Sequence, residues 1–401
     1  MDYYLILSVL ALIITGAAGA SLGRRTGIPR AIILIIFGII LSLLRYEGNR
    51  IIQCPLTAAE AIAAVAFIIV LFQSASIINL KETDSLSKKA FAFSSLFIFL
   101  SVVTVSSFSV LFFKFDFFTA LIFSVLAAQT ASEFTILLFR KERRRACSVL
   151  ADESVLTTPI LMLLPFIILE TKGLLGSVLT PSKTLSYSIF IAQQLIIGIS
   201  TAVLFSIIFI KALKKSYSKI LSPAVLMLGV MLSYIVAQYI NSSGIIAVIT
   251  FAIIFSSTYV KGKDSIIEFI RSVETPARLT VFLLAGLLAW NIGLTIGIII
   301  KTIAIFIILV CIRYLAAEIT LNELSFGEKA FIALSLRKGA ATAASILTLL
   351  FYNGGQMRSM LSIVLILIIL SITSSKIAEA SLEFLLGGSP LKIRRLDTEE
   401  I

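Results

Sequence analysis

The sequence predicts an all-α polytopic membrane protein with about thirteen transmembrane helices. Composition is the first reason: 59% of the 401 residues are hydrophobic, 14% are charged and the mean hydropathy is +1.06, whereas roughly a quarter of the residues in soluble domains are charged. Pattern is the second, because long apolar runs alternate with short connections that hold most of the lysines and arginines. The net charge of +12 therefore indicates membrane topology and no nucleic-acid partner.

The apolar runs give the expected spans, because a membrane helix needs about 20 apolar residues. They lie at about 3–22, 31–44, 58–80, 90–112, 117–139, 147–169, 186–210, 219–240, 242–260, 275–291, 295–317, 328–352 and 357–386. If these runs cross in alternation, most lysines and arginines fall on one side, as at 140–145 and 211–215. The positive-inside rule then predicts a protein of the cell membrane with its N-terminus outside and its C-terminus in the cytoplasm. Residues 1–386 are expected to form one transmembrane domain, and 387–401 a short cytoplasmic tail.

Two of these spans have the composition of interrupted helices. The fifth contains the stretch 127–133 and the twelfth contains 337–345, and both combine small residues with polar groups at membrane depth. Such a stretch can simply allow close helix packing. Unwound segments at corresponding places in two halves of a transporter also mark its binding site. Each stretch lies one span before the end of a six-span half, which favours the second interpretation.

The sixth span begins with a polar stripe. At 100° per residue, Glu153 and Ser154 share a helical face with Thr157 and Thr158. Polar groups at this depth are costly and usually face a partner or a water-filled path. The hydroxyls, with Thr130 and the amide of Gln129, could form a cage of neutral oxygens around a cation. The alternative is that each hydroxyl bonds the carbonyl one turn back in its own helix.

The order and spacing of these motifs resemble the monovalent cation/proton antiporter superfamily, nearest to the sodium/proton exchanger branch. Thr130-Ala131-Ser132 resembles the family's Thr-Asp-Pro on a broken helix, and the stretch from Glu153 to Pro159 resembles its Glu-Ser-x-x-Asn-Asp-Pro. Arginines of the family are matched by Arg278, Arg313 and Arg337. The resemblance implies inverted six-helix repeats at about 1–170 and 219–386, a linker helix at about 186–210, two crossed interrupted helices and a homodimer.

The sequence departs from the family at the central positions. Ala131 and Thr158 stand where the family has aspartates, and Thr157 stands where it has asparagine. A threonine hydroxyl can coordinate Na⁺ but cannot exchange a proton near pH 7. Because the chain has no histidine, we expect proton exchange at a carboxylate, and Asp152 and Glu133 are the nearby candidates. The alternative is that both carboxylates meet water or the basic cluster 140–145 at the inner mouth.

The resemblance also implies a structural ion pair between Glu153 and Arg313. A lone charge at that depth would cost several kcal/mol, so each residue needs a partner. The alternative is that Arg313 extends to the cytoplasmic surface about one turn away. Either arrangement would serve the architecture of the protein rather than ion turnover.

Taken together, the resemblance implies a secondary transporter, not an enzyme, that exchanges Na⁺ or K⁺ for protons in the lipid bilayer by alternating access and without a cofactor. Two alternatives stay open: a relative without proton coupling (a uniporter, channel-like path or sensor), and a sodium/solute symporter. No metal beyond the transported cation is expected. The candidate ion-binding or proton-exchange residues are Thr130, Glu133, Asp152, Glu153, Ser154, Thr157 and Thr158, supported by Gln129, Arg278 and Arg337.

Overall fold

The computed structural model describes residues 3–46, 49–50, 56–78, 85–131, 145–175, 181–215, 218, 221–260, 262–289, 295–352 and 354–380. Within these ranges the chain is helical apart from turns, a π-helical turn and one short antiparallel ladder, β1 (Arg45–Tyr46) with β2 (Asn49–Arg50), which was not predicted. Eight described helices are long and apolar enough to cross a membrane, and four shorter ones are apolar as well. The predicted all-α polytopic class is confirmed, while the count of thirteen crossings stays a prediction.

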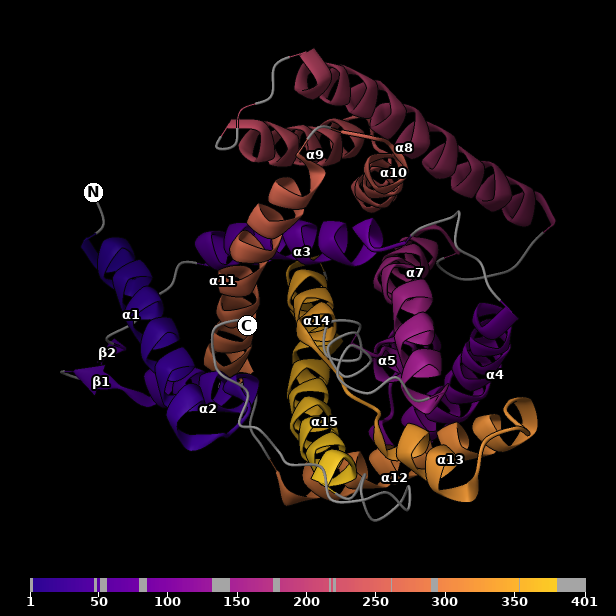
Figure 1. The fold of residues 1–401 in the computed structure, drawn as a ribbon. Helices are drawn as coiled ribbons and strands as arrows, with labels where there is room; N and C mark the ends of the chain where they lie inside the picture. The colour runs from indigo at the N-terminus through magenta and orange to yellow at the C-terminus, as the bar shows by residue number, and fades with distance from the viewer. Residues whose placement is uncertain are drawn as a thin grey trace.

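Six helices form one part of the molecule, which we call the scaffold. In this part α11 packs against α2 and α3, and α10 packs against α3 and α9. The long helix α8 (Pro181–Lys215) lies along α9 and α10 at the edge of the molecule (Figure 1). The scaffold comprises α1 (Tyr3–Thr26), α2 (Arg30–Leu43), α3 (Leu56–Ser76), α9 (Leu221–Tyr239), α10 (Gly244–Ser257) and α11 (Lys263–Ala289).

Apart from α8, the remaining described helices form a second part, which we call the bundle. Here α4 packs against α5, α7 and α12, and α15 packs against α12 and α14. Helix α14 also packs against α3 and α11, so it joins the bundle to the scaffold near the middle of Figure 1. The bundle comprises α4 (Ser85–Phe108), the π-helical turn η1 (Ser109–Phe113), α5 (Phe117–Ala128), α7 (Arg145–Leu175), α12 (Ile296–Thr320), α13 (Phe326–Leu334), α14 (Ala340–Tyr352) and α15 (Gly354–Ala380).

Two glycines let the scaffold helices α2 and α11 touch at the level of their backbones. A Cβ atom on Gly286 would lie 2.3 Å from the carbonyl oxygen of Ile35, and one on Gly38 would lie 2.3 Å from that of Leu283. Any side chain at either position would therefore push the helices apart. The reciprocal contact fixes how closely these two helices pack.

Helix α5 begins at a well-defined cap. The carboxylate of Asp116 accepts hydrogen bonds from the main-chain N–H of Thr119 at 3.2 Å and from its hydroxyl at 2.6 Å. Lys172 near the end of α7 donates to the same carboxylate at 3.1 Å. Burial raises the pKa of Asp116, but the hydrogen bonds from Thr119 and Lys172 outweigh burial and hold this pKa below its usual value of 3.8. The cap thus ties the start of α5 to α7.

The two predicted interruptions are visible where the chain is described. Helix α5 ends at Ala128, and Gln129 has extended backbone angles. In the twelfth predicted span, α13 ends at Leu334 and α14 begins at Ala340, so residues 335–339 are not helical. A capping box of Ser325 and Glu328 starts α13.

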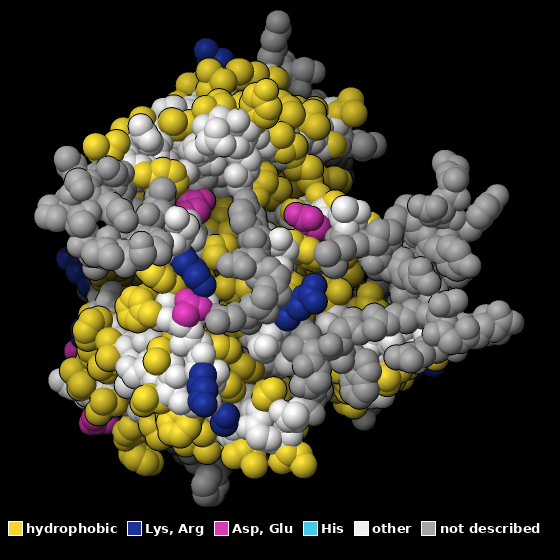
Figure 2. All heavy atoms as spheres, turned by 180° about the vertical axis from the view of Figure 1, so that it is seen from behind, with side chains coloured by type: hydrophobic (Ala, Val, Ile, Leu, Met, Phe, Trp, Pro, Cys, Tyr) yellow, Lys and Arg dark blue, Asp and Glu magenta, His cyan; other side chains and the backbone are white. Residues whose placement is uncertain are grey.

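The described surface is largely apolar, as a lipid-facing surface should be. Figure 2 shows hydrophobic side chains over much of the visible face, with only scattered lysine, arginine and acidic side chains. Large exposed apolar side chains occur on α4, α8, α9 and α12, including Phe99, Ile196, Leu228 and Ile300. Such a surface is expected for helices that contact lipid tails.

Candidate ion-binding site

The two non-helical segments meet inside the protein. The main-chain N–H of Ala131, after the end of α5, donates to the carbonyl oxygen of Arg337 at 2.8 Å. Gln129, Thr130, Ala131 and Lys338 are all buried. Main-chain groups at a helix break lack their usual helical partners and must find others. Here they partly satisfy one another, and we call this place the crossing.

Lys338 supplies the charged group at the crossing. Its side chain is 1% exposed, and its Nζ donates to the carbonyl oxygen of Gln129 at 3.3 Å and to that of Ala127. These two carbonyls lie at the end of α5, whose last helical residue is Ala128. The main-chain N–H of Lys338 donates to the hydroxyl of Ser371 on α15 at 3.1 Å. The ammonium group therefore caps the end of the opposite broken helix.

Sequence reasoning missed Lys338. The residue lies within the predicted stretch 337–345, but we expected the proton-exchanging group to be a carboxylate, Asp152 or Glu133. The available signal was a lysine beside Gly339 in a run of small residues at membrane depth, because an intramembrane charge is by default a candidate functional group.

Among the predicted hydroxyls of α7, that of Thr158 contacts the non-helical segment that follows α5. Its Oγ1 lies 2.6 Å from the carbonyl oxygen of Ser154 and 3.1 Å from that of Thr130. Thr157 donates to the carbonyl of Glu153 at 2.8 Å, and the hydroxyl of Ser154 donates to that of Ala151 at 2.9 Å. The last two hydroxyls thus adopt the alternative in which each bonds its own helix.

Several other polar atoms at and beside the crossing are buried without a partner among the described residues. They are both amide atoms of Gln129, the hydroxyl of Thr130, and the hydroxyls of Thr342 and Ser345 in the first two turns of α14. Buried polar groups are normally hydrogen-bonded, so this set of oxygens is a candidate place for a polar ligand or an ion to bind. Thr342 and Ser345 were not among the predicted site residues. They lie in the stretch 337–345 and add neutral oxygens to the set.

Glu153 and Arg313 form a two-pronged ion pair. The guanidinium nitrogens lie 2.7 and 2.5 Å from the two carboxylate oxygens, and Nε donates to the carbonyl of Ile332 at 2.9 Å. The rings of Phe93 and Phe97 lie 5.2 and 4.9 Å from the guanidinium carbon. Both charged groups are buried, so Arg313 does not extend to the surface. The pair joins α7 to α12, and its neighbours reach α4 and α13.

The two other predicted arginines pair away from the crossing. Arg337 lies 2.7 Å from Glu379 of α15, and Arg278 lies 3.3 Å from Glu274 one turn earlier on α11. The carboxylate of Glu274 is buried and was not predicted. Asp152 is half-buried on α7, one residue before Glu153, and Glu133 lies outside the described residues.

The three basic side chains around the crossing therefore differ in the kind of partner they contact. Arg313 and Arg337 each contact a carboxylate, whereas Lys338 contacts main-chain oxygens. The described residues contain no group of three histidine, cysteine or acidic side chains that could hold a metal ion. An ion at the crossing would be coordinated chiefly by neutral oxygens, as the hydroxyl stripe predicts.

Comparison with known proteins agrees with this architecture. The structure is similar to the sodium proton antiporter MjNhaP1 from Methanocaldococcus jannaschii at pH 8, with a TM-score of 0.74 and 17% identity, covering 95% of this chain and 98% of that one. An electron-microscopy structure of the same antiporter gives a TM-score of 0.67 at 17% identity, covering 98% and 100%. No curated protein sequence matches the chain. The model of the transmembrane region of sodium/hydrogen exchangers matches residues 9–378. With its helices interrupted and crossed inside a bundle, and with this match over nearly its whole length, the chain belongs to the sodium/hydrogen exchanger family.

Proposed function

We propose that the protein exchanges Na⁺ for H⁺ across a cell membrane, with the ion bound at the crossing of α5 with the segment between α13 and α14. The observation that carries the proposal is the set of buried oxygens at this place, on Gln129, Thr130, Thr342 and Ser345, that have no partner among the described residues. Hard alkali cations bind oxygen ligands. Family membership favours Na⁺ over K⁺ as the cation.

The arrangement of the two parts of the molecule supports alternating access as the mechanism. The crossing belongs to the bundle, and α14 contacts α3 and α11 of the scaffold. If the bundle rocks against the scaffold, the crossing is exposed first to one side of the membrane and then to the other. The buried pair of Glu153 and Arg313 ties α7 to α12 inside the bundle, which would let the bundle move as one body.

Proton coupling needs a group that loses a proton when Na⁺ binds. The family's aspartates are absent, and Lys338 is the charged side chain that contacts the freed carbonyls. A cation that uses these oxygens would have to displace the ammonium group, and desolvated lysines readily serve as proton-exchanging groups. We propose that Lys338 takes this role, ahead of the carboxylates of Asp152 and Glu133.

Neutral residues at the central positions favour one rival, a Na⁺ path without proton coupling. The test is transport by purified protein in proteoliposomes that contain a pH-sensitive dye, with uptake of radioactive Na⁺ measured in parallel. Exchange predicts proton movement when Na⁺ is added, and loss of that movement in Lys338→Gln. Na⁺ uptake without proton movement by the unaltered protein would support the uncoupled rival, and a requirement for an organic solute would support a symporter.

Folding and assignment controls keep this test sharp. Lys338→Gln must elute as the unaltered protein does from a size-exclusion column, because a misfolded variant would also lose exchange. Asp152→Asn and Glu133→Gln are measured beside it. If either of them abolishes proton movement while Lys338→Gln retains it, the proton is carried by that carboxylate and the role given to Lys338 is wrong.

A further inference from the structure

A small crevice lies between the bundle and the scaffold, away from the crossing. It has a volume of about 80 Å³ and is lined by Ile167 and Glu170 of α7, by Phe190, Ile191, Gln194 and Leu195 of α8, and by Ser243 and Ile246 at the start of α10. One water molecule occupies about 30 Å³ in the liquid. The crevice can therefore hold a small polar head group but not a large ligand as a whole.

Two hydrogen-bond acceptors in the crevice have no partner among the described residues. Glu170 makes no hydrogen bond or ion pair with any of them. Gln194 is buried, and its Oε1 has no partner. Its side-chain Nε2 donates to the main-chain carbonyl of Asn241 at 3.2 Å, and the main-chain carbonyl oxygen of Gln194 accepts from the hydroxyl of Ser242 at 3.0 Å. The amide is therefore held in place with its oxygen left over.

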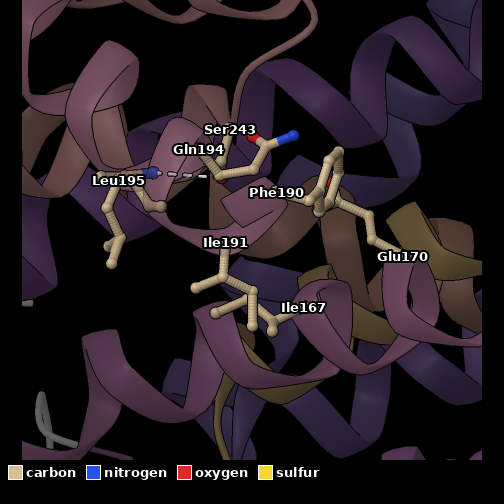
Figure 3. A pocket seen from close by; sticks show the side chains of 8 residues that line it. Ile167, Glu170, Phe190, Ile191, Gln194, Leu195 and Ser243 are labelled. Carbon is tan, nitrogen blue, oxygen red and sulfur yellow. Dashed lines mark hydrogen bonds between the residues drawn. The ribbon is translucent and has the colours of Figure 1, made fainter. Parts of the chain in front are cut away.

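Figure 3 shows how these groups lie. Glu170 extends from α7 toward the ring of Phe190, and Gln194 lies above Ile191 next to Ser243. The hydroxyl of Ser243 caps α10 by accepting from Ile246 at 3.5 Å, which leaves its own hydrogen available. Apart from these three polar groups, the walls are aliphatic side chains and one aromatic ring.

The chemistry of the walls selects the occupant. A carboxylate and an amide oxygen repel anions and attract a hydrogen-bond-donating cation. An alkali ion would need several more oxygens and would gain nothing from the apolar walls, whereas a primary ammonium group on an apolar body would satisfy both acceptors. Such a cation can also lie against the face of Phe190.

The depth of the crevice fits an amphiphile. Glu170 lies five residues before Leu175, the last residue of α7, which is about 8 Å at 1.5 Å per residue. Gln194 bonds Asn241 and Ser242 in the short connection between α9 and α10, so it lies at the level where these two helices end. Both are near the level of lipid head groups.

We propose that this Glu170–Gln194 crevice binds the primary ammonium group of an amphiphile, provided by a phospholipid head group or by a free alkylamine, and that the bound amphiphile holds α7 of the bundle against α8 and α10. The first half stands on the crevice alone. The second half rests on the proposed exchange by alternating access, because a contact between the two parts opposes their relative motion.

Binding is tested first in detergent, by thermal unfolding of the full-length protein with added hexylammonium. The melting temperature should rise by several degrees, with little rise for hexanol or for hexyltrimethylammonium, which has the charge but no N–H to donate. In Glu170→Gln, the hexylammonium concentration needed for a given rise in melting temperature should be at least ten times higher. Gln194→Leu should also need a higher concentration. The control is Glu60→Gln, at an exposed glutamate of α3, which should respond as the unaltered protein does.

An equal response from Glu170→Gln and the unaltered protein would overturn the proposal, as would an equal response to the trimethylated amine. Transport then separates the two sources. Exchange should be slower in vesicles of phosphatidylethanolamine and phosphatidylglycerol than in vesicles of phosphatidylcholine with the same anionic fraction, and Glu170→Gln should abolish the difference. If only added hexylammonium slows exchange, the free amine is the source.

Failure of the proposed exchange can be told from failure of this inference. If the unaltered protein moves no Na⁺ in any vesicle but still gains thermal stability from hexylammonium through Glu170, the crevice stands and the proposed function falls. If hexylammonium binds through Glu170 and exchange continues at its full rate, the amphiphile does not hold the two parts together, and that half of the proposal is wrong.

Discussion

At the scale of single residues, burial decides what an ion pair contributes. The pair of Glu153 and Arg313 has a shortest N–O distance of 2.5 Å, and so does the pair of Lys89 and Glu323 at the cytoplasmic end expected for α4. Side chains of the first pair are 1–2% exposed, and those of the second are 47% and 65% exposed. Distance alone would make them equal, yet water screens the second pair strongly.

We therefore expect Glu153→Gln to lower the stability of the protein by about 3–5 kcal/mol, because it leaves the Arg313 charge buried without its partner. Thermal unfolding in detergent measures the change. Glu323→Gln is the matched control and should leave the melting temperature nearly unchanged. A double variant, Glu153→Leu with Arg313→Met, should recover part of the loss, and an equally small effect of Glu153→Gln and Glu323→Gln would contradict the expectation.

The hydroxyls of Thr157 and Thr158 provide a second comparison between neighbours. The hydroxyl of Thr158 lies within hydrogen-bonding distance of the Thr130 carbonyl, which follows the end of α5. The hydroxyl of Thr157 donates to Glu153, within α7 itself. Valine has nearly the same shape as threonine but lacks the hydroxyl. Thr158→Val should raise the Na⁺ concentration needed for half-maximal exchange severalfold, and Thr157→Val should change it little. Equal effects of the two variants in proteoliposome transport would remove Thr158 from the ion site.

At the scale of secondary structure, sequence patterns foretold where helices break but not what occupies the breaks. The small-residue stretches 127–133 and 337–345 indicated interruption, and the chain indeed leaves the helix after Ala128 and Leu334. The contact of Lys338 with the end of α5 depends on a residue more than 200 positions away in the chain. Local composition contains no information on such a partner, so the absence of histidine and the nearby acidic residues pointed to carboxylates instead.

The cap of α5 depends on pH in a direction that its hydrogen bonds determine. The pKa of Asp116 is held below 3.8 in the folded protein, so the stabilisation by its carboxylate is fully present above about pH 4 and is lost as pH falls through the lowered pKa. Asp116→Asn should cost on the order of 1 kcal/mol at neutral pH, since the side chain is partly exposed and asparagine still caps helices. Melting temperatures of both proteins between about pH 3 and pH 6 should converge toward the acid end. A constant difference over this range would mean that the carboxylate charge does not contribute.

At the scale of the whole molecule, the sequence allowed the fold class to be predicted but not the packing of the helices. Apolar runs and basic connections predict a polytopic helical protein because hydrophobic length and charge asymmetry are local properties. The close approach of α2 and α11 at Gly38 and Gly286 depends on two glycines nearly 250 residues apart that face each other's backbones. Each glycine alone reads as an ordinary small residue in an apolar run.

That contact gives a prediction for the scaffold. Gly286→Ala places a Cβ atom 2.3 Å from the carbonyl oxygen of Ile35, so α2 and α11 must separate, and we expect a loss of about 1–3 kcal/mol. Gly297→Ala on α12 is the matched control, because a Cβ atom there meets nothing within 4 Å. It should be neutral or slightly stabilising, since alanine is the better helix former. If both variants melt at the same temperature, the two backbones are not in tight contact.

Orientation in the membrane is the property of the whole chain that two exposed tyrosines can test. Tyr239 ends α9 and Tyr259 follows α10, and they are 88% and 83% exposed. If the N-terminus is outside, as the distribution of lysine and arginine predicts, the α9–α10 connection faces outward and the end of α10 faces the cytoplasm. In a variant without Cys54, Cys147 and Cys311, Tyr239→Cys should react with a membrane-impermeant maleimide in intact cells, and Tyr259→Cys should react only after the membrane is opened. The reverse pattern would invert the topology and place the Glu170–Gln194 crevice on the cytoplasmic side, where the lipid composition differs.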